Sequence, residues 1–242
     1  MRKFYSYLIF SLLIISAVGC VKIKKTDAEY ERDNWIAGFT DSIEYYQKRK
    51  SQIEIALQDI NSQIVSQLND FEMIKKPREV SGYYLLKGWS SKIPLSSTGI
   101  YARINENEKI ELIATLAGST FNQIEVGSGD SNFFSEVMRH DQAFNFRHER
   151  FNTVYFSGGK ADTIAQFIAG HYNDKIDLKF LEGKIKKNFQ IPENEKNMIR
   201  KTWNLYNSQV EARKLQRELF ISSKKIDTFH RLLDAHEEKT KQ

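Results

Sequence analysis

The stretch from Ile36 to Ile74 reads IAGFTDSIEYYQKRKSQIEIALQDINSQIVSQLNDFEMI and contains no proline. Its apolar residues recur at alternating steps of three and four, at Ile36, Phe39, Ile43, Tyr46, Ile53, Leu57, Ile60, Ile64, Phe71 and Ile74, with Lys50 and Gln67 in the interrupting positions. This heptad spacing predicts a coiled-coil helix over 28–76. Lys50 is expected to weaken the seam and to help set register or partner choice. We expect Pro77 to end the helix, because the residue before a proline is disfavoured in the helical region.

A second long helix is predicted over 192–237, because neither proline nor glycine follows Pro192. Its entry, Pro192-Glu193-Asn194-Glu195, places acidic residues at the positive end of the helix dipole. The apolar residues form two stripes, one of Ile199, Trp203, Tyr206 and Val210 and one of Leu215, Leu219, Ile226, Phe229 and Leu233. The stripes are out of phase, which indicates either a kink or a change of packing partner. The two helices pair antiparallel within one chain or, alternatively, each pairs with another protomer.

The segment 78–191 between the helices holds ten of the twelve glycines and reads as mostly β-strand. Short β-prone runs are expected at 83–89, 99–104, 109–116, 121–126, 133–138, 143–148, 153–156, 176–181 and 184–189, with a helix at 161–171. Connections are expected at 105–108 and 127–130. The fold class predicted is therefore α+β, with long terminal helices flanking a small, mostly antiparallel β module. That module is expected to be a sandwich or partly open barrel with one covering helix.

The N-terminus has the three-part build of a secretory signal. Arg2 and Lys3 precede an apolar run from Tyr7 to Val18, which ends in Ala17-Val18-Gly19-Cys20. The run is shorter than the ~20 residues that a membrane-spanning helix needs. This arrangement resembles the lipobox of bacterial lipoproteins. The resemblance implies removal of a signal peptide, 1–19, and attachment of lipid such as palmitate to Cys20, followed by a linker, 20–27. The alternative is an uncleaved anchor with an incidental cysteine.

Composition limits the other function classes. Removal of residues 1–19 leaves 223 of 242 residues and no second cysteine for a disulfide, and loss of Arg2 and Lys3 lowers the formal charge from +5 to +3. That mild excess does not favour nucleic-acid binding. From Lys184 to Lys225 there are eleven Lys or Arg against four Glu. This excess suits an anionic surface, such as lipid head groups or cell-wall polymer, or is simply a solvated helix face.

The sequence contains only partial matches to motifs for phosphate binding, metal binding or nucleophilic catalysis. Ser157-Gly158-Gly159-Lys160 is followed by Ala161, which lacks the hydroxyl and the spacing of a phosphate loop, so Ser157 and Asp162 are interpreted as helix caps. His140-Asp141, His148-Glu149 and His171 offer metal-binding groups without the spacing of a helical zinc site. Ser128 and Ser131 lack the Gly-x-Ser-x-Gly elbow. The expectation is a chain without catalytic residues, metal or cofactor.

Aromatic residues are dense in the β module and are expected mainly to fill its core. The alternative is an exposed platform for sugar or peptide, formed by Tyr84, Trp89 and Tyr101. A concave pocket lined by these residues would favour that alternative.

The chain as a whole resembles lipoproteins of the Bacteroides group that have no assigned activity, notably at 82–89 (GYYLLKGW) and 140–143 (HDQA). If the sorting rules of such lipoproteins apply, Val21 rather than aspartate after the cysteine argues against retention at the inner membrane. Lys22 and Lys24-Lys25 lack the acidic character associated with surface display, so the resemblance implies an outer-membrane position facing the periplasm. Three functions follow as hypotheses. The first is a non-enzymatic envelope interaction or scaffold module on a helical stalk, with self-association or an envelope protein as partner. The others are a binding module for cell-wall glycan or peptide, and an enzyme with an unrecognised site.

Overall fold

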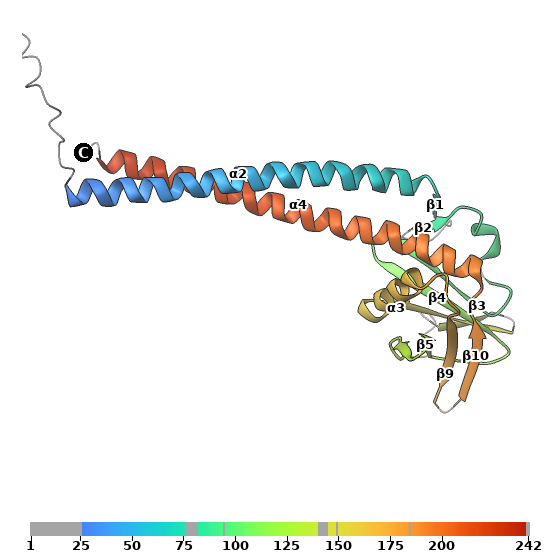
Figure 1. The fold of residues 1–242 in the computed structure, drawn as a ribbon. Helices are drawn as coiled ribbons and strands as arrows, with labels where there is room; N and C mark the ends of the chain where they lie inside the picture. Colours follow the sequence, from blue (N-terminus) through green and yellow to red (C-terminus); the bar gives the residue numbers. More distant parts are fainter. Residues whose placement is uncertain are drawn as a thin grey trace, which may run out of the picture. The chain divides into compact units, whose positions relative to one another are not determined.

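The computed structural model describes residues 26–75, 82–93, 95–139, 145–148, 150–183 and 185–240. The fold is α+β, as predicted: two long helices flank an antiparallel module of two sheets (Figure 1). The chain divides into two compact units. A helical unit comprises Met1–Lys50 and Ile221–Gln242, and the second unit, Ser51–Phe220, contains the β module.

Helix α2 (Asp27–Leu68) begins with a capping box. The Thr26 hydroxyl accepts a hydrogen bond from the Glu29 amide (3.3 Å), and the Thr26 amide donates to the Glu29 carboxylate (2.7 Å). The predicted seam is confirmed along the helix, because Ile43, Ile53 and Leu57 are all buried.

The prediction that this helix continues to 76 is wrong. The chain turns at Asn69 and Asp70, and strand β1 (Phe71–Ile74) pairs antiparallel with strand β2 (Tyr83–Leu86). Phe71 and Ile74 continue the heptad spacing of α2, and that spacing predicts that both residues belong to the coiled-coil seam. Phe71 is instead buried in the core of the β module, and Ile74 packs against that core. Pro77 lies outside the described residues.

In the helical unit, α2 packs antiparallel against α4 (Glu193–Thr240) of the same chain. Trp35 stacks on His236 with ring centroids 4.3 Å apart, while Phe39 and Tyr46 both contact Phe229, at 5.5 and 5.9 Å. Residue numbers rise along α2 as they fall along α4. Of the two predicted pairings, the one within a single chain is therefore observed.

The phase shift between the two stripes of α4 reflects a change of packing partner. In the second unit, Ile199 belongs to the core of the β module and Trp203 and Tyr206 pack against it. In the helical unit, Phe229 of the other stripe faces α2. Residues 193–240 form one uninterrupted helix.

The β module contains a six-stranded sheet, β1-β2-β3-β4-β8-β7, and a four-stranded sheet, β10-β9-β5-β6, in which all neighbours are antiparallel. The remaining strands are β3 (Gly99–Asn105), β4 (Ile110–Ala117), β5 (Gln123–Ser128), β6 (Ser131–Phe134), β7 (Asn145–His148), β8 (Phe151–Ser157), β9 (Asp177–Glu182) and β10 (Ile185–Gln190). The expected covering helix is α3 (Gly159–Gly170), which buries Ile164, Phe167 and Ile168. The aromatic core includes Phe121 and Phe180, whose rings meet edge to face at 4.8 Å.

Candidate functional site

The predicted aromatic platform is not present on the surface. Trp89 and Tyr101 retain only 6% and 2% exposure and belong to the core cluster, against which the half-buried Tyr84 packs. Neither of the two cavities described below is lined by these three residues. The core interpretation is therefore the correct one, and the expectation of an exposed ligand-binding face formed by Tyr84, Trp89 and Tyr101 is wrong.

Several other predicted positions fall outside the described residues, namely Cys20, His140, Asp141 and Glu149, and of His148 only the backbone is described. His171 is exposed at the end of α3, with its Nδ1 3.0 Å from the Phe167 carbonyl oxygen. Within the described ranges, no three His, Cys, Asp or Glu side chains gather in a way that could hold a metal ion. Among the same residues, no helix is both long and apolar enough to span a bilayer.

Gly158, immediately before α3, makes the turn into the helix. Gly158 has φ +92°, a conformation that residues with a side chain rarely adopt, and no side chain caps the helix start. The expectation of capping by Ser157 or Asp162 is therefore wrong. Asp162 instead accepts a hydrogen bond from the Tyr206 hydroxyl at 3.0 Å, which ties α3 to α4. Burial raises the pKa of the Asp162 carboxyl above its ordinary value.

A buried carboxylate at the start of α4 was missed by the sequence reasoning. Strand β2 pairs with β3 only at Tyr83–Asn105 and Tyr84–Ile104, so much of that edge of β3 needs other partners. Helix α4 supplies two of them. The Ile100 amide donates to the Glu195 carboxylate at 2.9 Å, and the Ala102 amide to the Met198 sulfur at 3.3 Å.

The Glu195 carboxylate lies directly against Gly99, so a larger residue at position 99 would have to displace it. A Cβ at Gly99 would lie 2.5 Å from Glu195 Oε1, which is closer than atoms approach. Burial raises the pKa of Glu195 from 4.5 to about 7, and the hydrogen bond from Ile100 opposes that shift. An acidic residue in the first turn of a helix normally suggests only a dipole partner, so no sequence signal marked Glu195 as buried.

A small cavity, here called the polar cavity, lies where the end of α2, strand β1 and helix α4 meet. It has a volume of about 250 Å³ and is lined by Gln67, Asp70, Phe71, Arg200, Lys201 and Asn204. Lys201 Nζ forms an ion pair with Asp70 Oδ2 at 2.8 Å. The other charged lining residue, Arg200, donates from Nη2 to Asn197 Oδ1 at 2.8 Å, and its guanidinium carbon lies 4.0 Å from the ring centroid of Tyr172.

Two buried polar atoms of the cavity-lining residues have no hydrogen-bond partner within the described structure. They are Arg200 Nε, a donor, and Gln67 Oε1, an acceptor. Leaving such an atom unpaired costs about 1–3 kcal/mol, so native proteins pair most of them with protein, water or ligand. Because the lining residues are far apart in sequence, with Asp70 and Lys201 separated by 131 positions, no local motif could predict the cavity.

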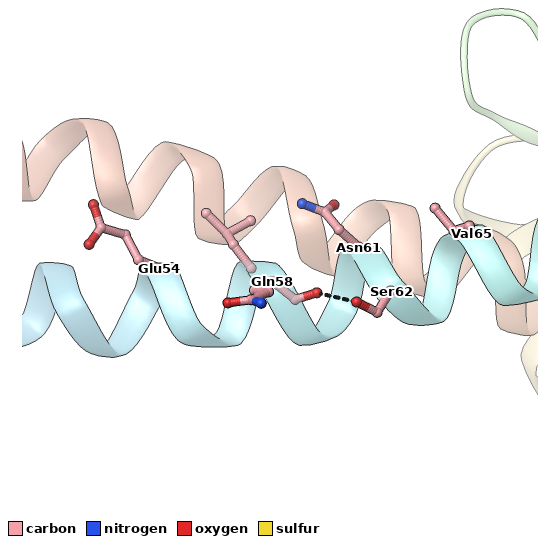
Figure 2. A pocket seen from close by; sticks show the side chains of 6 residues that line it. Glu54, Gln58, Asn61, Ser62 and Val65 are labelled. Carbon is pink, nitrogen blue, oxygen red and sulfur yellow. Dashed lines mark hydrogen bonds between the residues drawn. The ribbon is translucent and has the colours of Figure 1, made fainter.

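A larger, open groove runs along α2 and has a volume of about 670 Å³ (Figure 2). Its lining residues, Glu54, Leu57, Gln58, Asn61, Ser62 and Val65, all belong to this one helix. The Ser62 hydroxyl donates back to the Gln58 carbonyl at 2.9 Å, and Val65 remains 63% exposed. This groove is a stretch of helix surface with few groups that could carry out chemistry.

Comparisons of the chain with protein-family models, with curated proteins and with solved structures each found no match.

Proposed function

We propose that this chain is a non-enzymatic envelope protein, tethered by lipid at Cys20, that acts as an interaction or scaffold module. In this proposal it sits on the outer membrane and faces the periplasm. The paired helices serve as a stalk between the lipid and the β module, and they contact a second envelope protein or another copy of the chain.

The observation that carries the proposal is the order of parts along the chain. A lipobox-like sequence ends at Cys20, and α2 begins seven residues later, at Asp27. At about 1.5 Å per residue, the 42 residues of α2 extend for about 63 Å. A helix of this length directly after an anchor is more than a small β module needs for its own packing, and it suits a spacer.

The surfaces of the helices support a role in contacts. In the helical unit Tyr30 and Tyr45 are both 63% exposed, and in the second unit Ile55 and Phe220 are 63% and 62% exposed. Scattered exposed apolar residues are normal, but large ones on long helices supply the kind of anchor that dominates protein interfaces.

A membrane fractionation of cells that produce the wild type or Cys20→Ser tests the tether. The wild type is expected in the membrane fraction, with labelled palmitate incorporated, and the variant in the soluble fraction without label. Ser16→Ala, in the same N-terminal segment, is the matched control and should behave as wild type. Crosslinking followed by pull-down then compares partners. If the variant stays in the membrane and captures identical partners, the lipid-tether account fails.

A further inference from the structure

The two sheets end in four edge strands, each with a strand partner on one side only within the described structure. They are β1 and β7 in the six-stranded sheet and β10 and β6 in the four-stranded sheet. An open edge invites pairing with another strand, and charged residues on the edge are one way in which proteins prevent it. Three of the edge strands carry charge, with Glu72 in β1, Arg147 in β7, and Lys186 and Lys187 in β10. Strand β6, with the sequence SNFF, carries none.

Strand β6 is also open to solvent. Three of its four residues are exposed, and Phe134 retains 48% exposure. Its neighbour Phe133 packs against the core of the module, with its ring centroid 4.8 Å from that of Phe167 in α3. Because side chains alternate between the faces of a strand, Phe134 lies on the opposite face, away from that core. A second strand at this edge would remove part of the Phe134 ring from water.

The backbone groups that β6 presents at its open edge belong to Asn132 and Phe134. The Ser135 amide continues the pairing with β5 by donating to the Ile124 carbonyl at 2.9 Å. In an antiparallel pair, only every second residue bonds to a given neighbour, so the residues that bond to β5 are those counted back in twos from Ser135. Asn132 and Phe134 therefore direct their N–H and C=O groups away from β5, and no described group bonds to them.

A second copy of the chain supplies the groups that this edge needs. In an antiparallel pairing about a two-fold axis at Phe133, Asn132 of one copy lies opposite Phe134 of the other. All of the outward N–H and C=O groups of both copies then form hydrogen bonds with each other. The outer face of each copy also gains contact between the Phe134 ring and the neighbouring strand.

Charge singles out β6 as the edge that can pair with itself. Self-pairing of β10 would bring Lys186 and Lys187 of the two copies close together, and like charges opposite each other are destabilising. Next to β6, Glu136 already has a cation, because Lys160 Nζ lies 3.4 Å from its Oε2. In the two-fold pairing, Asp130 of the turn in one copy lies near this Glu136–Lys160 pair of the other, so no uncompensated like charges meet.

We propose that two copies of the chain pair antiparallel through β6, which joins their four-stranded sheets into one continuous sheet. A pairing of four-residue strands buries much less than the ~1,200 Å² of a standard interface, so the dimer is weak, with a dissociation constant of about 0.1 mM. Every residue involved lies in the unit that contains the β module. The inference goes beyond the proposed function, which assigns contacts to the helices, and it does not depend on the lipid tether.

Sedimentation velocity of the full-length chain in a density-matched mild detergent, at concentrations up to about 1 mM, measures the pairing. The wild type should shift from monomer to dimer. Phe134→Lys places like charges close to the two-fold axis and should raise the dissociation constant about tenfold or more. Met73→Lys is the matched control, because Met73 is 47% exposed on the edge strand β1, and it should dimerise as the wild type does. If the wild type stays monomeric, or if both lysine variants dimerise equally, the proposal is wrong.

Asn132→Pro tests the backbone contact itself. Proline lacks the N–H that faces outward at this position, whereas the bonds to β5 are retained, so the dimer should weaken while the hairpin still folds. Circular dichroism establishes that each variant is folded, and if Asn132→Pro fails to fold, Phe134→Lys decides alone. Amide exchange locates the pairing, because exchange at Phe134 should slow as the wild type is concentrated. A dimer in which the Phe134 amide exchanges as freely as in the monomer would assign self-association to the helices and overturn the proposal.

Discussion

The contacts inside the helical unit differ in kind from the contacts inside the β module. In the helical unit, α2 and α4 meet through half-buried rings such as Phe39 and Phe229 on regular stripes. In the module, large side chains such as Phe121 and Phe180 are fully buried, and the edge of β3 is completed by side chains of α4. Regular stripes are visible in a sequence, whereas side chain to backbone bonds between distant segments are not. The two regions should also differ in how strongly each depends on a single residue.

The largest expected effect comes from the module core. Phe121 is fully buried, between Phe156 and Phe180. Phe121→Ala removes its ring and leaves a cavity, so it should lower the free energy of unfolding by about 3–5 kcal/mol. Denaturant unfolding followed by circular dichroism measures this loss. A loss below about 1 kcal/mol would mean that the module is not packed as described.

The second-largest expected effect is a pH-dependent gain in stability on replacing Glu195. The pKa of Glu195 is about 7 in the folded state against an ordinary value of 4.5. Between these pH values the folded state holds a proton that the unfolded state has released, so the free energy of unfolding falls as pH rises through this window and is level above it. Glu195→Gln keeps an acceptor for Ile100 without the charge. It should stabilise the protein by about 3 kcal/mol at pH 8 and by little below pH ~4.5.

Thermal and denaturant unfolding between pH 4 and pH 8 measures this difference. Glu193→Gln, two positions away in the same helix turn and exposed, is the control and should follow the wild-type profile. A Glu195→Gln profile parallel to that of the wild type would contradict the buried, partly protonated carboxyl.

A smaller loss is expected in the helical unit. Phe229 contacts both Phe39 and Tyr46 but is only half-buried. Phe229→Ala should therefore cost about 1–2 kcal/mol, less than the same substitution at Phe121. Hydrogen exchange of the α2 amides before residue 50 reports the change. If exchange in this part of α2 is unaffected, the pairing of α2 with α4 is not what protects it.

The smallest effect is at the start of α2. Thr26→Ala removes the hydroxyl that caps the Glu29 amide and should cost about 0.5–1 kcal/mol, confined to the first turn. Amide exchange at residues 27–30 is the measurement. Thr40→Ala is the control, because the Thr40 hydroxyl bonds only to the Ile36 carbonyl within the same helix. Equal changes in the two variants would argue against the capping box.

Most of the fold follows from local patterns. Both long helices, the covering helix and the turn after Asn105 were predicted, because each depends on spacing or composition over a few residues. Strand β1 was missed because the three-residue step from Phe71 to Ile74 fits a heptad, whereas only the residue types, an aromatic and a β-branched one, favour a strand. The predicted strand at 133–138 ends at Phe134, and Ser135 instead uses its hydroxyl to accept from the Ile124 amide.

The candidate site was far less predictable. Trp89 and Tyr101 were considered because aromatic residues suit both a core and a binding face, and only the packing decides which. The polar cavity depends on Gln67, Asp70 and Arg200, whose side chains are ordinary polar residues in the sequence. Their significance arises from tertiary packing, which brings the end of α2 against the first turns of α4.

Intact mass spectrometry of the protein extracted from membranes tests the central claim, the tether at Cys20, most directly. The account predicts a chain that begins at Cys20, with 223 residues after loss of 19 from 242, and that carries acyl groups on that cysteine. A chain that retains residues 1–19, with an unmodified Cys20, would contradict it.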